Sequence, residues 1–325
     1  MNTDVLKIDP GLVAGQIATV IQDQVFHQLR RRGVVVGLSG GVDSTVVAAL
    51  CARALGTGCV LGLLMPEHDS DPESLRLGRL VAASLGIEAI VEDIAPILDG
   101  AGCYRRRDDF VRRVFPEYGP GYKCKLVLPS VLEGAGYNLS WLVVESPEGV
   151  QQRTRPPLEA YLGIVAASNM KQRTRKQLES YHADRLNYAV AGTPNRLEYD
   201  QGFFVKNGDG AADLKPIAHL YKSQVYQLAE SLGVPEEVRL RTPTTDTYSL
   251  PQTQEEFYFS LPYDKMDLCL FALNHGIPPA EVAGAASLTT EQVERVYRDI
   301  RSKRRATAYQ HSRPLLVELV PEVKS

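Results

Sequence analysis

The chain has 325 residues, of which 44% are hydrophobic and 23% charged, with a formal net charge of −3. This composition predicts a globular protein with a sizeable core, and the nearly balanced charge argues against a nucleic-acid-binding surface. No apolar run is long enough to suggest a membrane span, and the N-terminus lacks a signal-peptide pattern. Five scattered cysteines without a C-x-x-C pair favour free thiols in a reducing, cytoplasmic compartment, and the histidines show no zinc-ligand spacing.

Helical and strand patterns alternate through the first hundred residues. Apolar positions at helical spacing predict a helix over 11–31, and the unbroken apolar run 33–38 predicts a buried strand. The following segments predict, in order, a helix over 43–55, a strand over 60–64, a helix over 72–85 and a strand over 88–91. This alternation predicts an α/β fold with a doubly wound parallel sheet.

Residues 99–157 break this rhythm, because they are rich in Gly, Pro, Arg and Tyr. Two apolar runs within them, 125–128 and 139–144, are compatible with a hairpin. We interpret the segment as an insertion or lid, with a plain surface elaboration as the alternative. The chain as a whole, residues 1–325, is expected to form a single domain.

The second half of the chain is predicted to be mainly helical. A helix over about 158–183 precedes a short strand at 188–191. Further helices are expected over about 221–232, 264–275, 279–286 and 289–305. The last of these has a typical capped start, with Thr289 or Thr290 followed by Glu291. The parallel sheet is therefore expected to carry a helical C-terminal part.

A glycine-rich loop, Ser39–Thr45, lies between the first predicted strand and its helix. Gly40 and Gly41 let the backbone approach a ligand closely, and the following helix directs its free N–H groups and positive dipole end at that ligand. Ser39, Ser44 and Thr45 add hydroxyl donors, so the loop predicts a phosphate or pyrophosphate site. It matches neither the Walker A motif, which has a lysine, nor G-x-G-x-x-G. A glycine-rich turn without a ligand is the alternative.

Asp43 needs a separate explanation, because a carboxylate in an anion site would repel phosphate. Its presence is understandable if Mg²⁺ lies between the carboxylate and the phosphate oxygens. A role as helix N-cap is also possible and is compatible with metal binding.

The strand followed by Ser-Gly-Gly-Val-Asp-Ser resembles the phosphate loop of the N-type ATP pyrophosphatases, which have the Rossmann-like, adenine nucleotide alpha hydrolase-like fold. That family cleaves ATP between the α and β phosphates and adenylates a substrate. Further motifs resemble NAD synthetases of the ammonia-dependent type. They read Asn-Met-Lys-Gln-Arg-Thr-Arg at 169–175, Gly-Thr-Pro-Asn-Arg-Leu-Glu at 192–198, Gly-Phe-Phe-Val-Lys-Asn-Gly-Asp-Gly-Ala-Ala-Asp at 202–213, Leu-Tyr-Lys-Ser-Gln at 220–224 and Thr-Pro-Thr-Thr-Asp at 242–246.

The resemblance covers residues 11–98 and 158–275 well and implies a ligase that converts deamido-NAD to NAD. ATP, as co-substrate, would adenylate the nicotinate carboxylate with release of pyrophosphate, and ammonia would then displace AMP. The resemblance also implies Mg²⁺ as cofactor and a homodimer. Because positioning and charge neutralisation carry such phosphate chemistry, no covalent nucleophile is expected.

The resemblance also implies roles for individual residues. It places ATP against Ser39, Gly40, Gly41, Asp43, Ser44, Thr45, Arg175, Thr193, Lys222 and Thr244. It places Mg²⁺ on Asp43 and Glu198. It places deamido-NAD against Asn169, Arg173, Phe203, Lys206, Asp209 and Asp213, with the first two reaching across the dimer interface. Phe203 and Phe204 are equally compatible with the core, and an exposed helical lysine is the alternative for Lys222.

Three segments depart from the family's pattern. The 99–157 segment is longer than expected, residues 252–260 carry aromatics in place of an acidic residue and Leu-Gly, and residues 303–305 replace a His-Lys-Arg type run. Since all three belong to the acid-binding side or to a lid, amidation of a different carboxylic acid is an alternative. Thiolation of tRNA or a nucleotide is disfavoured by the cysteine placement, and a non-catalytic nucleotide sensor by the presence of both Asp43 and Glu198.

The sequence also bears on the source of the amide nitrogen. About ten residues precede the first predicted helix, which leaves no room there for the amidohydrolase domain of glutamine-dependent relatives. Free ammonia is therefore the expected donor, with a separate amidotransferase partner as the alternative.

Overall fold

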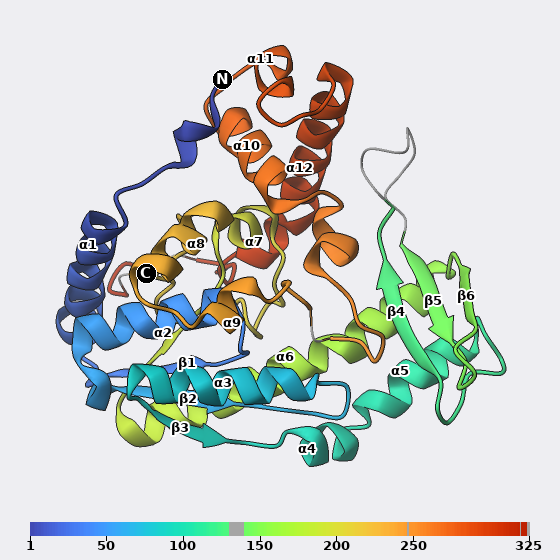
Figure 1. Ribbon diagram of the computed structural model, residues 1–325. Helices are drawn as coiled ribbons and strands as arrows, with labels where there is room; N and C mark the ends of the chain where they lie inside the picture. The colour runs from blue at the N-terminus through green and yellow to red at the C-terminus, as the bar shows by residue number, and fades with distance from the viewer. Residues whose placement is uncertain (130–139, 246, 319, 324–325) are drawn as a thin grey trace.

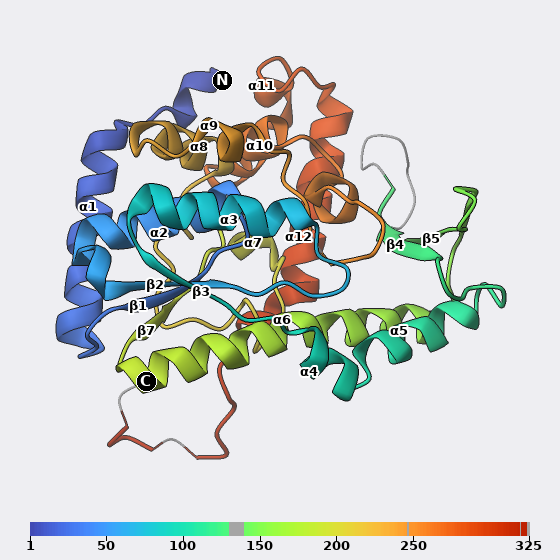
Figure 2. The same cartoon turned by 60° about the horizontal axis from the view of Figure 1, so that its bottom comes forward.

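The computed structural model describes residues 1–129, 140–245, 247–318 and 320–323. It contains a four-stranded parallel sheet in the order β3-β2-β1-β7, of which Figure 1 labels β1, β2 and β3 and Figure 2 also labels β7. Its strands are β1 (Val34–Gly37), β2 (Val60–Leu64), β3 (Glu88–Val91) and β7 (Ala189–Ala191). Val35 pairs with Leu61 on one side and with Val190 on the other, so β1 is an inner strand. The predicted parallel α/β fold is confirmed.

Helices cover both faces of this sheet (Figure 2). One face carries α1 (Pro10–Gln22), α2 (Val42–Leu55), α3 (Pro72–Leu85) and α8 (Lys222–Ser231), and the other carries α4 (Ala95–Gly100) and α6 (Leu158–Leu186). Successive strand residues point to opposite faces, so Val34 and Val36 pack in the first layer while Val35 packs in the second. Both faces of β1, β2 and β7 are buried, which explains why these strands read as unbroken apolar runs, whereas the edge strand β3 is partly exposed.

The helix predicted over 11–31 is shorter and changes type. After α1, residues Asp23–Gln28 form a π-helical turn, η2, in which the N–H of Leu29 donates to the carbonyl of Gln24. Arg30 then adopts a left-handed φ of 53°, which ends the helix. Two short 3-10 turns, η1 (Thr3–Leu6) and η3 (Thr57–Cys59), complete this half of the chain.

The C-terminal part is helical, as predicted, and has its own core. Its elements are α7 (Arg196–Gln201), the π-helical turn η4 (Glu255–Phe259), α10 (Tyr263–Asn274), α11 (Pro279–Ala283) and α12 (Thr290–His311). The short helix α9 (Glu236–Leu240) instead packs on the core of the central sheet through Val238. The side chain of Thr289 accepts a hydrogen bond from the N–H of Gln292 and caps α12, which confirms the predicted capped start. Within the described residues, no helix combines the length and apolar character needed to cross a membrane.

Part of the 99–157 segment forms a second, antiparallel sheet, which we call the inserted sheet. It consists of β4 (Lys123–Val127), β5 (Trp141–Glu145) and β6 (Gln151–Thr154), and α5 (Cys103–Arg112) packs between it and α6. Lys125 pairs with Val143, so the predicted hairpin is confirmed. Leu139 of that prediction and Asp246 of the 242–246 motif lie outside the described residues.

Candidate active site

The glycine-rich loop lies at the carboxyl end of β1 and leads directly into α2. Gly41 precedes this helix, and no side chain caps its N-terminus. Gly40 has a φ of +71°, and a Cβ atom there would lie 2.7 Å from the carbonyl oxygen of Ser74. Only glycine fits this turn, which aims the positive end of α2 at the space beyond β1.

The hydroxyl groups of the loop divide into two kinds. Thr45 is fully buried, and its hydroxyl donates to the carbonyl of Gly41 at 2.8 Å. Ser44 is 3% exposed, and its Oγ lies 3.1 Å from both the Gly41 carbonyl and the Ser39 hydroxyl. Ser39 itself lines a cavity. Ser44 and Thr45 therefore hold the loop in shape, whereas Ser39 faces ligand space.

Three predicted residues meet in a buried cluster beside the loop. The ammonium of Lys222, at the start of α8, contacts Oδ2 of Asp43, and its side chain is 1% exposed. Asn195 joins the cluster, because its amide nitrogen donates to Oδ1 of Asp43 at 3.1 Å and its backbone N–H donates to Oε2 of Glu198 at 3.0 Å. Glu198 in turn completes a capping box at the start of α7.

The electrostatics of this cluster are those of a cation site. Burial, followed by the nearby charge of Asp43, raises the pKa of Glu198 to about 8. Burial lowers the pKa of Lys222, but Asp43 and Glu198 raise it more, so its net shift is upward. One ammonium faces two carboxylates, and one negative charge is left over when Glu198 ionises. These donors fit Mg²⁺, which commonly binds one or two carboxylates together with substrate phosphates and water.

The protein alone does not provide a complete set of metal ligands among its described residues. Across the described ranges, no group of three or more His, Cys, Asp or Glu side chains is arranged to hold a metal ion. Asp43 and Glu198 thus offer a partial set of ligands, of the kind that a phosphate-bound cation completes.

Two cavities lie near the cluster: one borders the glycine-rich loop at Ser39, and the other reaches the cluster at Glu198. The loop cavity, of about 170 Å³, lies over the ends of β1 and β2, and the aromatic cavity, of about 370 Å³, lies between α6, α7 and the residues around 245–258. The residues that line both are Gln172, Thr193, Asp209 and Thr245. A molecule in one cavity would therefore touch the same side chains as a molecule in the other.

Stacked rings form one wall of the aromatic cavity. The rings of Phe203 and Tyr258 stack at 4.6 Å with an angle of 21° between their planes, and Phe257 and Tyr248 extend the wall. Gln254 lies where this wall meets the carboxylates, because its amide donates to Oε1 of Glu198 at 3.3 Å. The geometry suits a planar ring with a polar group directed toward Glu198.

The other predicted residues fall into two groups. Arg175 donates to the Met65 carbonyl at 3.3 Å and lines the loop cavity, which also contacts Thr193. Thr244 lines an adjoining opening, while Asn169, Phe203 and Asp209 line the aromatic cavity. Phe204 is 9% exposed and lines it too, although its ring also packs on Tyr199.

Arg173, Lys206 and Asp213 line neither cavity. Asp213 accepts the N–H of Val190 at 2.7 Å and so secures the end of β7. Lys206 donates to the carbonyl oxygens of Tyr309 and Ser312, and Arg173 is exposed on α6 and donates to the Lys206 carbonyl. In the single chain these three residues are thus structural or surface groups.

A buried ionic network that the sequence analysis did not single out supports the cavity walls. The ammonium of Lys171 lies 3.0 Å from Glu67, 2.6 Å from Asp69 and 2.7 Å from the carbonyl of Thr247. Arg107 also contacts Asp69. Burial raises the pKa of Asp69, but Lys171 and Arg107 lower it more, so its net shift is downward. The network joins α6 and α5 to the residues beside Tyr248.

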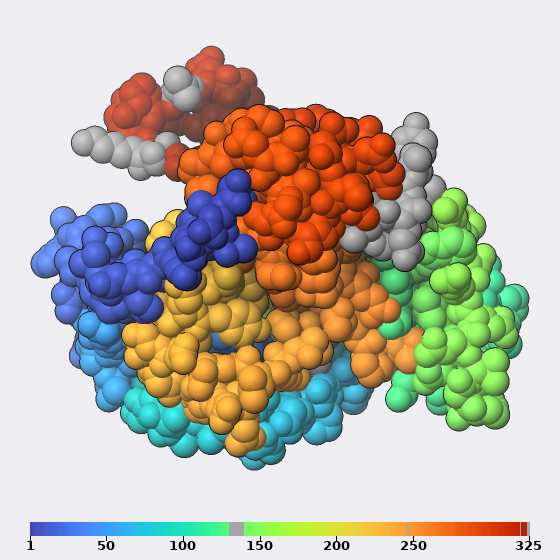
Figure 3. Space-filling view, turned by 45° about the horizontal axis from the view of Figure 1, so that its top comes forward, coloured from blue at the N-terminus to red at the C-terminus, as the bar shows by residue number. Residues whose placement is uncertain are grey.

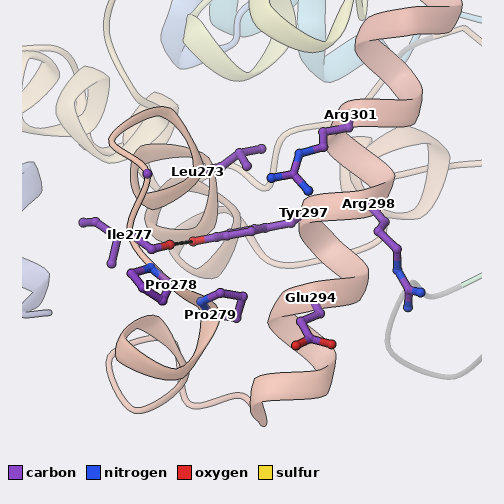
Figure 4. Close-up of a pocket in the computed structure, with 9 residues that line it drawn as sticks. Leu273, Ile277, Pro278, Pro279, Glu294, Tyr297, Arg298 and Arg301 are labelled. Carbon is purple, nitrogen blue, oxygen red and sulfur yellow. Dashed lines mark hydrogen bonds between the residues drawn. The ribbon is translucent and has the colours of Figure 1, made fainter.

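A third cavity, of about 380 Å³, lies between the α10–α11 link and α12 (Figure 4). Tyr297 crosses its floor and donates to the carbonyl of Ile277 at 3.0 Å, and Glu294, Arg298 and Arg301 line one side. It contains none of the predicted site residues. The loop and aromatic cavities are therefore the candidate active site.

Comparison with known proteins identifies the family. The NAD synthase family model matches residues 13–108 and 150–310, which include the glycine-rich loop, Glu198 and Lys222 but not β4 and β5. An NH(3)-dependent NAD(+) synthetase of Rhizobium meliloti is 64% identical over 323 residues, covering 99% of this chain and 96% of the relative. An NH(3)-dependent NAD(+) synthetase of Thermotoga neapolitana is 36% identical over 269 residues, covering 81% of this chain and 87% of the relative.

A solved structure shows the same fold. The NH3-dependent NAD synthetase from Campylobacter jejuni superposes with a TM-score of 0.62 at 23% identity, over 96% of this chain and all of that one. Fold, phosphate loop and sequence identity agree, and the chain belongs to the NAD synthase family.

Proposed function

We propose that this protein is a ligase that amidates deamido-NAD with ammonia, consuming ATP and releasing AMP and pyrophosphate. The observation that carries the proposal is that the loop cavity and the aromatic cavity share Gln172, Thr193, Asp209 and Thr245. A phosphate chain held at the glycine-rich loop and a pyridine carboxylate among the aromatic rings would thus meet. The names of the relatives in Rhizobium meliloti and Thermotoga neapolitana support the same substrate and nitrogen donor.

The proposed chemistry has two steps that balance. A carboxylate oxygen of deamido-NAD attacks the α-phosphorus of ATP, the bond to the β-phosphate breaks, and pyrophosphate leaves. The nitrogen of ammonia then attacks the acyl carbon, loses a proton, and expels AMP. Neither step requires a covalent bond to the protein, so the side chains act by orienting the reactants and offsetting their charge.

Charge is the main obstacle to the first step, because both reactants are anions. The N-terminus of α2 and the Lys222 ammonium would offset charge on the ATP phosphates. Asp43 and Glu198 would hold Mg²⁺, which supplies further positive charge at the phosphates when bound. The remaining proposed ATP contacts are Ser39, Gly40, Gly41, Arg175, Thr193 and Thr244, while Ser44 and Thr45 would act by holding the loop in shape.

The acid would occupy the aromatic cavity. We propose that its pyridine ring packs against Phe203, with Asn169 and Asp209 contacting the rest of the dinucleotide. Lys206, Arg173 and Asp213 lie outside the cavity of the single chain, so a contact by Arg173 would have to reach the substrate bound to a second copy.

We propose a homodimer formed through α6. Leu158 and Leu162 are 71% and 54% exposed, and Asn169 and Arg173 continue the same face of the helix at intervals of seven and four residues. Two exposed leucines at the start of a long helix, followed by polar residues on the same side, suit a symmetric contact. We further propose that residues 1–325 form one domain, into which residues 99–157 are inserted.

The experiment that tests the function follows pyrophosphate and NAD together. Purified protein is incubated with ATP, Mg²⁺, ammonium and deamido-NAD, and Asp43→Ala is run in parallel. Equal amounts of pyrophosphate and NAD, both lost in Asp43→Ala, are expected. Pyrophosphate formed only when another pyridine carboxylate replaces deamido-NAD would instead assign a different acid. Replacing ammonium by glutamine should abolish the product unless a separate amidotransferase is added.

A further inference from the structure

The inserted sheet contacts the segment that carries the aromatic wall. We infer that the β4 edge positions this segment, residues 249–259, which contributes Phe257 and Tyr258 to the wall, for the acid substrate, with Lys125 as the principal positioning residue. The inference rests on the proposed function, because it concerns the substrate that the aromatic cavity receives. In the space-filling view of Figure 3, the green surface of the inserted sheet adjoins an orange surface formed by residues near 250.

The backbone of β4 makes hydrogen bonds on both of its edges. One edge pairs with β5. On the other, the N–H of Cys124 donates to the Ser249 hydroxyl at 2.9 Å, and the N–H of Leu250 donates to the Cys124 carbonyl at 3.2 Å. Farther along, the amide of Gln252 donates to the Leu126 carbonyl.

The contact continues beyond the end of the strand. The N–H of Leu128 donates to the Glu256 carbonyl at 3.2 Å. Residues 124, 126 and 128 thus present their outward backbone groups to the same segment, with the two-residue period of a strand. Residues 249–256 therefore cover a strand edge that would otherwise be left open.

Lys125 adds a charged contact to this edge. Its ammonium lies 2.6 Å from Oε1 of Glu256 and 3.2 Å from the carbonyl of Pro251. Its side chain is 14% exposed, and that of Glu256 is 35% exposed. A charge-assisted bond whose lysine side is shielded from water is stronger than a fully exposed surface pair. Lys125 therefore joins two points of the segment, at 251 and 256, to one point of β4.

The segment held in this way carries the groups that face the substrate space. Gln254, Phe257 and Tyr258 line the aromatic cavity, and so does Leu128, the residue after β4. Gln254 donates to Glu198, and its own Oε1 accepts the Tyr263 hydroxyl at 2.6 Å. A shift of residues 249–256 would thus move both the ring wall and the amide that faces Glu198, but not the glycine-rich loop.

The family model matches residues 249–259 but not β4. The segment lies in the matched region 150–310, whereas β4 and β5 lie in the unmatched residues 109–149. The support for the acid-binding wall thus comes from a part of the chain that the family model does not include. The insertion acts first on the acid side of the reaction, and it reaches the proposed ATP contact Thr244 through the bridge of that residue with Thr253.

The test uses Lys125→Met, which keeps the length of the side chain and removes its charge, with Lys125→Arg as the conservative variant. Glu256→Gln removes the partner at a half-exposed position and serves if Lys125→Met does not fold. Gln152→Ala, on the exposed strand β6 at the far side of the same sheet, is the matched control. Steady-state kinetics are measured for deamido-NAD and for ATP separately.

For Lys125→Met we expect the KM for deamido-NAD to rise roughly tenfold, the cost of one shielded charged hydrogen bond. The KM for ATP and kcat should stay within about twofold, because uniform binding of the acid is what is lost. Lys125→Arg should recover most of the affinity, and Gln152→Ala should match the wild type. Equal increases in both KM values, or a loss confined to kcat, would overturn the inference.

A second measurement separates this inference from the proposed function. Hydrogen exchange of peptides covering residues 249–259 is followed without substrates. Faster exchange at Leu250 and its neighbours in Lys125→Met, but not in Gln152→Ala, is expected, and unchanged exchange would contradict the support by β4. A wild-type protein that does not amidate deamido-NAD but shows this exchange pattern would refute the substrate and keep the structural support.

Discussion

The ammonium of Lys222 contacts the carboxylate of Asp43, although the two residues are 179 positions apart in the chain. Asp43 lies in the first turn of α2 and Lys222 begins α8, so this ion pair fixes how the two helices meet beside the phosphate loop. The pair is almost completely buried on the lysine side. It therefore contributes both to the fold and to the charge of the site.

Lys222→Met should be strongly destabilised, because it leaves a carboxylate without its cation in a buried place. We expect the free energy of unfolding to fall by about 3–5 kcal/mol. In the double variant Lys222→Met/Asp43→Asn, much of that loss should be recovered, while pyrophosphate release stays abolished. Urea unfolding and the pyrophosphate assay measure the two effects. A double variant no more stable than Lys222→Met would show that the pair is not what holds the helices.

Glu198 should make stability depend on pH in a particular direction. Its pKa is raised from the ordinary value of 4.5 to about 8 by burial and by Asp43. Between these values the folded protein holds a proton that the unfolded chain has lost, so the free energy of unfolding should fall as pH rises from about 4.5 to about 8. Urea unfolding at a series of pH values should show this slope in the wild type and a shallower one in Glu198→Gln.

The raised pKa of the Glu198 carboxylate also predicts how the stabilisation by Mg²⁺ depends on pH. A bound cation favours the ionised carboxylate, so Mg²⁺ should raise the melting temperature more at pH 8.5 than at pH 6. The difference should disappear in Glu198→Gln. An equal effect of Mg²⁺ at both pH values would argue against Glu198 as a ligand.

Gly40→Ala should weaken ATP binding as well as the fold. Gly40 and Gly86 both have left-handed φ angles, of 71° and 65°, but a Cβ at Gly40 would lie 2.7 Å from the Ser74 carbonyl whereas nothing lies within 4 Å at Gly86. Gly86→Ala should therefore cost only the backbone strain, about 1–2 kcal/mol. Gly40→Ala should cost more and raise the KM for ATP. Equal losses of stability would show that the loop backbone can shift to relieve the contact.

Leu162→Glu should dissociate the proposed dimer, because it places a charge beside Leu158, in the exposed leucine pair of α6. Leu12→Glu changes a leucine that is exposed to a similar extent, 60%, on α1 and should leave the mass in solution unchanged. Light scattering after size-exclusion chromatography compares the two variants. A dimer that survives Leu162→Glu would place the contact elsewhere.

The features that the sequence predicted are those determined by local pattern. The strands around the glycine-rich loop and the capped start of α12 depend on neighbouring residues. The contacts of Gln254 with Glu198 and of Lys171 with Thr247 could not be predicted, because each joins residues 56 or 76 positions apart. Gln254 was part of a segment recognised only as divergent, and its polar role becomes visible once α7 lies beside it.

Two elements of the 99–157 segment also escaped prediction. β6 consists mostly of exposed residues, so it has no alternating apolar face that would mark a strand. α5 contains Arg105-Arg106-Arg107, which reads as a solvated run, yet Arg107 is 7% exposed and contacts Asp69. Its burial depends on a partner in a distant loop, which the local pattern does not contain.

The order of strands in the central sheet has a consequence for biosynthesis. Val34 of β1 pairs with Val60 on one edge and with Ala189 on the other. At ordinary synthesis rates, Ala189 emerges from the ribosome roughly 10–30 seconds after Val34. During that interval an apolar inner strand has one open edge. The nascent chain is therefore exposed to wrong pairing until β7 arrives, and expression at lower temperature or with chaperones should favour the native protein.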